Sequence, residues 1–148
     1  MDGANRAVTE ALKEAPEYAD AHAILALIHL ARGERDRAET ELREAERLDP
    51  DMVTLPMMWA DYYASGGDLA RAAEYAKKSL KAASHNWQVR LKAGMIFRAA
   101  GLYDEMRKEA RAVMDMISPE QRGTMEQRIL QILGPTALEE PLDDDEEL

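Results

Sequence analysis

The chain has 148 residues, of which 46% are hydrophobic, and it carries a formal net charge of −10. This length corresponds to about one domain, and the apolar content is sufficient for one core. Cysteine is absent from the sequence, which excludes disulfides and thiolate chemistry and is compatible with a reducing compartment.

Composition also limits the partners. The N-terminus lacks an apolar signal segment, and no run approaches the roughly 18 apolar residues that span a bilayer. We therefore expect a protein of the cytoplasm or another soluble compartment, without direct membrane insertion. The last ten residues hold seven acids and no base, and no basic stripe precedes them. Because nucleic-acid phosphates must be met by clustered Lys and Arg, we expect no nucleic-acid partner.

Three glycines, Gly33, Gly67 and Gly101, are evenly spaced along the chain. A tight turn between two helices needs a residue that tolerates positive φ, and closely packed helices need small residues where they cross. Small and apolar residues, and one ring position, recur at the same interval as the glycines. They fall in four columns: Ala26, Ala60 and Gly94; His29, Tyr63 and Phe97; Ala38, Ala72 and Met106; Leu42, Ala76 and Ala110. This period predicts stacked helical repeats instead of one central core.

These residues resemble the tetratricopeptide repeat, a helix-turn-helix unit of about 34 residues with small residues at the helix crossing and a proline near its end. The resemblance implies an all-α fold, a right-handed α-solenoid of antiparallel helix pairs. It covers three full repeats, a partial N-terminal unit and a C-terminal capping helix. The chain departs from the family pattern at His22, Pro56 and Arg90, which stand where the first helix usually carries an aromatic residue.

The partial unit occupies residues 1–18. Pro16 stands one repeat length before Pro50, and Val8, Ala11 and Leu12 fall in the columns of a second helix. This segment is either a half-repeat that caps the N-terminus or part of a longer array, and the sequence leaves both alternatives open.

Three full repeats follow, at residues 19–52, 53–86 and 87–118. Each is predicted to contain a first and a second helix joined by one of the three glycine turns. The expected helices are 20–32 and 36–48, then 54–65 and 69–82, then 88–100 and 103–117.

A closing helix is predicted at residues 119–134. Ser118 followed by Pro119 and Gln121 is a helix-start pattern, and Gly134 is expected to end the helix. We expect the helix to cover the exposed side of the last repeat. Its apolar residues recur on one face: Met125, Ile129, Ile132 and Leu133.

Residues 135–148 form an acidic tail, which we expect to be disordered because it lacks the apolar content to fold. Leu138, Leu142 and Leu148 alternate with acids there. Three roles stay open for the tail: solvation, a short interaction motif, or an occupant of the protein's own groove.

The resemblance also implies where a partner binds. In tetratricopeptide arrays the first helices line the concave face, and the second, fifth, ninth and twelfth places of each repeat point into the groove. Methionine suits adaptable peptide-binding surfaces, and Asp61 and Arg98 are expected to orient a peptide. The groove is predicted at these positions: Ala23, Leu27, Leu30, Met57, Asp61, Leu91, Met95 and Arg98.

One subfamily of these arrays fits poorly. Arrays that capture the C-terminal carboxylate of chaperone tails use a clamp of Lys and Asn, whereas the matching positions here are Ala23, Leu27, Met58 and Lys92. Only Lys92 keeps a similar charge. We therefore expect recognition of an apolar or amphipathic segment and not of a free acidic C-terminus.

No catalytic, cofactor or metal site assembles in the sequence. His22 and His29 lie two helical turns apart and lack the i+4 partner of a zinc pair. No phosphate loop, nucleophile elbow or dinucleotide fingerprint occurs. We expect no enzyme activity, no cofactor and no metal.

The sequence thus predicts a non-catalytic adaptor that holds a protein or peptide partner in a concave groove. Two alternatives stay open. One is a bacterial secretion-type chaperone for apolar client segments, which fits the size and charge. The other is a structural unit that self-associates through unpaired terminal helices.

Overall fold

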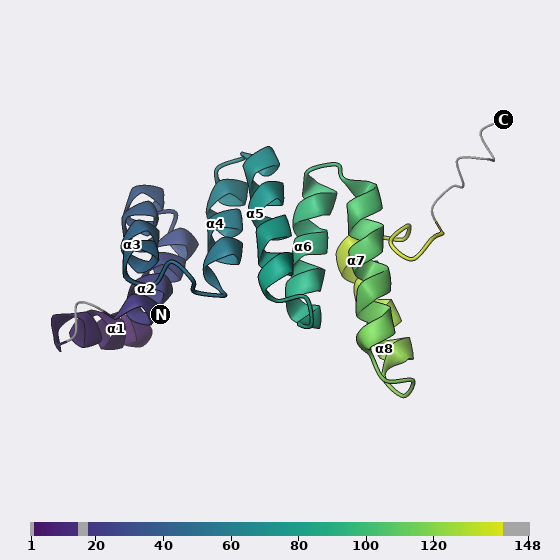
Figure 1. The fold of residues 1–148 in the computed structure, drawn as a ribbon, viewed down its shortest axis with the longest axis horizontal. Coiled ribbons are helices and arrows are strands. Elements are labelled where there is room, and N and C mark those ends of the chain that lie inside the picture. The colour runs from purple at the N-terminus through teal and green to yellow at the C-terminus, as the bar shows by residue number, and fades with distance from the viewer. Residues whose placement is uncertain (1, 15–17, 141–148) are drawn as a thin grey trace. The chain divides into compact units, whose positions relative to one another are not determined.

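The computed structural model describes residues 2–14 and 18–140 (Figure 1). Within these ranges the chain is helical and contains no strand, so the predicted all-α fold of helix pairs is confirmed. The chain divides into two compact units, an N-terminal unit (Met1–Ser79) and a C-terminal unit (Leu80–Leu148). Each unit is described by itself.

The helices of the three repeats lie within one residue of their predicted bounds. Helix α1 precedes them, and α8 follows them. The bounds are α1 (Asp2–Glu14), α2 (Ala19–Ala31), α3 (Arg35–Leu48), α4 (Leu55–Ser65), α5 (Leu69–Ala82), α6 (Trp87–Ala99), α7 (Tyr103–Met116) and α8 (Arg122–Leu133).

The three spaced glycines reverse the chain between the two helices of each repeat. Gly33, Gly67 and Gly101 have φ values of 75°, 82° and 77°, a region that costs any residue with a Cβ atom. In the first turn the Gly33 amide donates to the Leu30 carbonyl at 3.0 Å, and equivalent bonds close the other two turns at 3.1 and 3.0 Å. The glycines are therefore required by the backbone of the turns.

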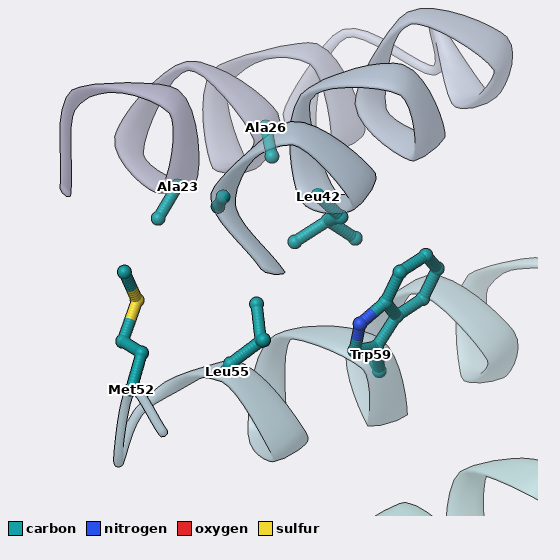
Figure 2. Packing of buried hydrophobic residues seen from close by; sticks show 7 residues of the cluster. Ala23, Ala26, Leu42, Met52, Leu55 and Trp59 are labelled. Carbon is teal, nitrogen blue, oxygen red and sulfur yellow. The ribbon is translucent and has the colours of Figure 1, made fainter. Parts of the chain in front are cut away.

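The core of the N-terminal unit joins α2, α3 and α4. Leu42 of α3 is fully buried between Ala26 of α2 and Trp59 of α4 (Figure 2). The second helix of the repeat thus packs against its own first helix and the next first helix together. The buried members of this cluster are Ala23, Ala26, Leu42, Ala45, Met52, Leu55 and Trp59.

In the first and third repeats a polar side-chain pair stands where the family pattern has an aromatic residue early in the first helix. His22 Nδ1 lies 2.5 Å from Glu41 Oε2 in the first repeat, and Arg90 Nη1 lies 2.9 Å from Glu109 Oε2 in the third. The two pairs occupy the same two columns, and each joins the first helix of a repeat to the second. Arg90 also donates through Nε to the Ser84 carbonyl at 2.7 Å.

The C-terminal unit packs α8 against α6 and α7. Gly94 permits this approach, because a Cβ atom at its position would lie 3.2 Å from a methyl carbon of Leu133. The fully buried side chains of this unit include Phe97, Met106, Ile129 and Leu133. Of the face expected for the closing helix, Met125, Ile129 and Leu133 are buried, whereas Ile132 is half-buried.

The start of the closing helix needs correction. Helix α8 begins at Arg122 and not at 119, and its first residue is preceded by Gln121 without a side-chain capping bond. Residues 118–121 instead form a turn closed by the Gln121 amide on the Ser118 carbonyl at 3.0 Å. Ser followed by Pro is as favourable at the first two positions of a β-turn as at a helix start, and here the turn is formed.

The predicted disorder of the tail is wrong for residues 135–140. Turns form there. The Ala137 amide donates a hydrogen bond to the Gly134 carbonyl at 3.2 Å, and Ala137 is only 1% exposed. Arg107 of α7 donates to the Thr136 carbonyl at 3.2 Å. Local turn bonds, one side-chain hydrogen bond from Arg107 and one buried methyl group thus hold a segment of low apolar content. The prediction for residues 141–148 falls outside the described residues.

Candidate protein-binding surface

Helices α2 and α6 are buried on most of their circumference and leave a narrow stripe at the surface. In α2 the exposed residues are Asp20, Ile24, Leu27 and Ala31, whose spacing of four, three and four residues defines one helical face. The remaining sides of α2 carry its buried residues, Ala21, Ala23, Ala26 and Ile28.

The same stripe recurs in the same columns of the other two repeats. In α6 the exposed members are Gln88, Lys92, Met95 and Ala99. In the second repeat the equivalent residues are Thr54, Met58, Asp61 and Ser65, of which the middle two are half-buried. We call these three sets the first-helix stripes. A surface that recurs with the repeat is the kind that solenoids present to partners.

The structure separates the predicted groove residues into two groups. Leu27 and Met95 are 39% and 49% exposed, Leu30 and Asp61 are half-buried, and Arg98 is exposed. The fifth-place residues are buried in all three repeats: Ala23, Met57 and Leu91 are 2%, 8% and 7% exposed.

Sequence reasoning missed the sixth place, where Ile24 is 46% exposed. Of its equivalents, Met58 is half-buried and Lys92 is exposed. The signal that was available is Lys92, because a lysine is almost never fully buried without a partner, so its whole column is expected at the surface. Helix α2 alone gives no such signal, since it is apolar on nearly every side.

The stripes of the two units differ in chemistry. In the N-terminal unit Ile24 and Leu27 are apolar, and the nearest charge on the α2 stripe is the exposed Asp20. In the C-terminal unit Met95 lies between the basic side chains of Lys92 and Arg98 along α6. Arg98 also donates through Nη1 to the Ile132 carbonyl in the last turn of α8, at 3.0 Å.

An aromatic cluster of Trp59, Tyr62, Tyr63 and Tyr75 joins α4 to α5 in the N-terminal unit. The ring centroids of neighbouring members lie 5.2 to 6.2 Å apart. Such contacts contribute about 0.5–1.5 kcal/mol beyond the area that they bury. Cations lie over the rings: Arg35 on Tyr62 at 4.4 Å, Lys78 on Tyr75 at 4.5 Å, Arg71 on Tyr63 at 5.6 Å and Arg43 on Trp59 at 5.8 Å.

The pKa values of two tyrosines of the aromatic cluster and of the neighbouring Glu39 are shifted. Hydrogen bonds from Arg43 and from the Tyr62 hydroxyl hold the pKa of Glu39 below its usual range. Burial raises the pKa of Tyr62 and of Tyr75. These shifts favour the ionised carboxylate and the neutral phenols, which are the forms that pack and bond in the cluster, so we assign it a role in stability.

The histidines lie in separate environments. His22 is bound by Glu41, and His29 Nδ1 lies 3.5 Å from Glu34 Oε1. His85 lines a shallow depression formed by residues 82–88. In the part of the chain that the structure describes, no three His, Cys, Asp or Glu residues converge as a metal site. Across the same residues no helix is both long and apolar enough to cross a bilayer.

Two family models, both described as tetratricopeptide repeat, match residues 1–55 and 57–115. The chain belongs to the tetratricopeptide-repeat family. A search of curated protein sequences gave no significant match. Among solved structures, the crystal structure of YrrB, a TPR protein with an unusual peptide-binding site, is 17% identical to this chain. The alignment covers 90% of this chain and 88% of that chain, with a TM-score of 0.43.

Family membership supports a protein-interaction adaptor, because tetratricopeptide repeats are generally non-catalytic interaction modules. The stacked helix pairs of such arrays expose extended surfaces to other proteins. Protein or peptide partners are thus the class that the tetratricopeptide repeats of this chain support.

Proposed function

We propose that this tetratricopeptide-repeat chain binds an apolar or amphipathic segment of another polypeptide along its first-helix stripes. The observation that carries the proposal is the recurrence of exposure in the same columns of α2 and α6. Large apolar side chains occupy those columns in both units, Leu27 in one and Met95 in the other. Each leaves a large part of its apolar surface in water, which an apolar partner would cover.

The energetics indicate what the partner must offer. Full burial of a Leu, Ile or Met side chain contributes about 1.5–3 kcal/mol, so covering the exposed parts of Ile24, Leu27 and Met95 contributes about 1 kcal/mol each. A micromolar complex requires about 8 kcal/mol. We therefore expect the partner to add hydrogen bonds and charge contacts, to Asp61 within the α4 stripe and to Arg98 beside the α6 stripe.

The test compares partner capture by three forms of the chain. Leu27→Asp with Met95→Asp places a carboxylate in the stripe of each unit. The matched control is Tyr103→Asp with Met116→Asp, which changes two exposed apolar residues of α7, a second helix. Circular dichroism verifies that all three forms fold, and quantitative mass spectrometry measures what each captures from the native source.

We expect the control to capture the same proteins as the parent chain. The amount of these proteins that the stripe variant captures should be at least tenfold lower. Capture that is equal for all three forms would refute binding along the first-helix stripes. Capture that is lost in the control alone would move the site to the second helices.

A further inference from the structure

The second repeat contains a glycine that its backbone does not require. Gly66 ends α4 with φ −90° and ψ 0°, a conformation that any residue adopts. The equivalent residues in the other repeats are Arg32 and Ala100, which end α2 and α6 in the same region. Another feature must therefore explain the glycine at this place.

That feature is the side chain of Arg35, the first residue of α3. A Cβ atom built on Gly66 would clash with the central carbon of the guanidinium group and with both of its terminal nitrogens. The guanidinium of a side chain from the preceding repeat thus occupies the space that a methyl group would fill.

Arg35 also binds the end of α4. Its Nη2 donates to the Tyr62 carbonyl at 3.0 Å, and its central carbon lies 4.4 Å from the centroid of the Tyr62 ring. In the first and third repeats the equivalent carbonyls, of Ile28 and Ile96, accept the backbone amide four residues later, whereas the Gly66 amide bonds to Tyr63 and Ala64 instead. The Tyr62 carbonyl also accepts the Ser65 hydroxyl at 2.7 Å. Arg35 is therefore its second side-chain donor and places a cation at the negative end of α4.

A related arginine contact lies in the C-terminal unit, beside a glycine that the backbone does require, since Gly134 has a φ of 96°. Arg98 of α6 donates to the Ile132 carbonyl in the last turn of α8, and its guanidinium lies against Gly134, 3.5 Å from where a Cβ atom would stand. In both units an arginine binds the C-terminal turn of another helix beside a glycine, of α4 in one unit and of α8 in the other.

We propose that Arg35 is a positioning residue, which fixes the end of α4 against α3 and thereby sets the spacing between the α2 and α4 stripes. The binding part of this inference rests on the proposed function. Arg35 lies outside the stripes, but Leu27 and Asp61 are in the halves of α2 and α4 that lie nearest the Gly33 and Gly67 turns. A guanidinium is suited to this role, because its planar face packs on the ring and the glycine while its edge donates to the carbonyl.

A double-mutant cycle tests the contact without any partner. Gly66→Ala should lower the melting temperature of the full chain by several degrees, because the new methyl group displaces the guanidinium. In an Arg35→Ala background the same change should leave the melting temperature unchanged or raise it, since alanine is a better residue than glycine at this φ. Equal effects of Gly66→Ala in both backgrounds would overturn the contact.

Peptide affinity tests the positioning. The probe is a peptide selected from a random library on the immobilised full chain, and it is titrated well below the melting temperature of every variant. Arg35→Lys and Gly66→Ala should each weaken binding about three- to tenfold, which corresponds to a modest change in binding free energy. The control Arg37→Lys changes an exposed arginine of the same helix that pairs with Glu34, and it should leave the affinity unchanged.

Unchanged affinity in both test variants would overturn the positioning role, even where the cycle shows coupling. Failure of the proposed function is seen separately, as retention of the peptide by Leu27→Asp with Met95→Asp. Loss of affinity in the Arg37→Lys control to the same extent would also overturn the inference, because a general effect of replacing an arginine on α3 would then explain the result.

Discussion

Two leucines in neighbouring helices of the first repeat should respond differently to the same truncation. Leu42 is fully buried in the core of the N-terminal unit, whereas Leu27 is 39% exposed on the α2 stripe. Burial of a leucine contributes about 1.5–3 kcal/mol, and the cavity left behind raises the cost of a buried Leu→Ala change to about 2–5 kcal/mol. Leu42→Ala should therefore lower the free energy of unfolding by about 2–5 kcal/mol. Leu27→Ala should lower it by about 1 kcal/mol or less.

Tryptophan fluorescence measures the two changes in the unit that contains both leucines. The chain has two tryptophans, Trp59 and Trp87, and Trp59 is the one buried against Leu42 in the N-terminal unit. In a Trp87→Phe background, urea unfolding followed by emission therefore reports on this unit. The two variants should differ in their urea midpoints while keeping similar slopes.

Either of two results would refute this reasoning. A cost for Leu27→Ala as large as that for Leu42→Ala would make Leu27 part of the core and remove it from the binding surface. A cost below about 1 kcal/mol for Leu42→Ala would contradict the close packing of α2, α3 and α4.

Three further predictions concern stability. Gly67→Ala should lower the free energy of unfolding by about 1–2 kcal/mol, because Gly67 has a positive φ. Gly123→Ala in α8, where a new methyl group meets open space, should raise the free energy of unfolding by up to about 1 kcal/mol. Equal effects of the two changes on urea unfolding would contradict this. Glu109→Gln should lower the free energy of unfolding by about 1–3 kcal/mol, because it breaks the partly buried pair with Arg90 of α6. Asp104→Asn, at the exposed pair with Arg107, should change it little. A larger loss for Asp104→Asn than for Glu109→Gln would refute this ranking of the two pairs. The raised pKa of Tyr75 stabilises the fold below pH of about 10, and this contribution is lost as the pH rises through the folded pKa. Tyr75→Phe should therefore flatten the fall of the urea midpoint between pH 8 and 11, and an unchanged fall would exclude Tyr75 as its source.

The fold could be predicted from the sequence because its signals are local and repeat. A glycine turn in every full repeat sets where each helix ends, and small residues at the crossings set which faces pack. The helix bounds in the three repeats accordingly agree within one residue. The start of α8 was missed because Ser118 and Pro119 are equally suited to a turn, so the local signal was ambiguous.

The binding surface could be predicted only in part. The ninth place of the repeat is at the surface in α2 and α6, as Leu27 and Met95 show, but the fifth place is buried and the sixth is exposed. The exposed face is thus rotated about the helix axis by one residue from the predicted face. An almost wholly apolar helix such as α2 contains no pattern that fixes which face is exposed.

Contacts between distant residues lay beyond sequence reasoning. Arg35 and Gly66 lie in different repeats, and neither belongs to a column that recurs. The same holds for Arg107, which binds the Thr136 carbonyl and orders a segment predicted to be disordered. Such contacts depend on how the repeats pack and on long flexible side chains, which leave no periodic trace.

Methyl NMR of the full chain tests the proposed binding surface most directly. A peptide selected from a random library on the immobilised chain is titrated onto protein labelled at its Ile, Leu and Met methyl groups. The account predicts saturable shift changes at Ile24 and Leu27 of the α2 stripe and at Met95 of the α6 stripe, while Met116 on α7 stays unchanged. It predicts no such changes in the variant with Asp at positions 27 and 95. Changes centred on Met116, or binding that persists in that variant, would contradict a surface formed by the first-helix stripes.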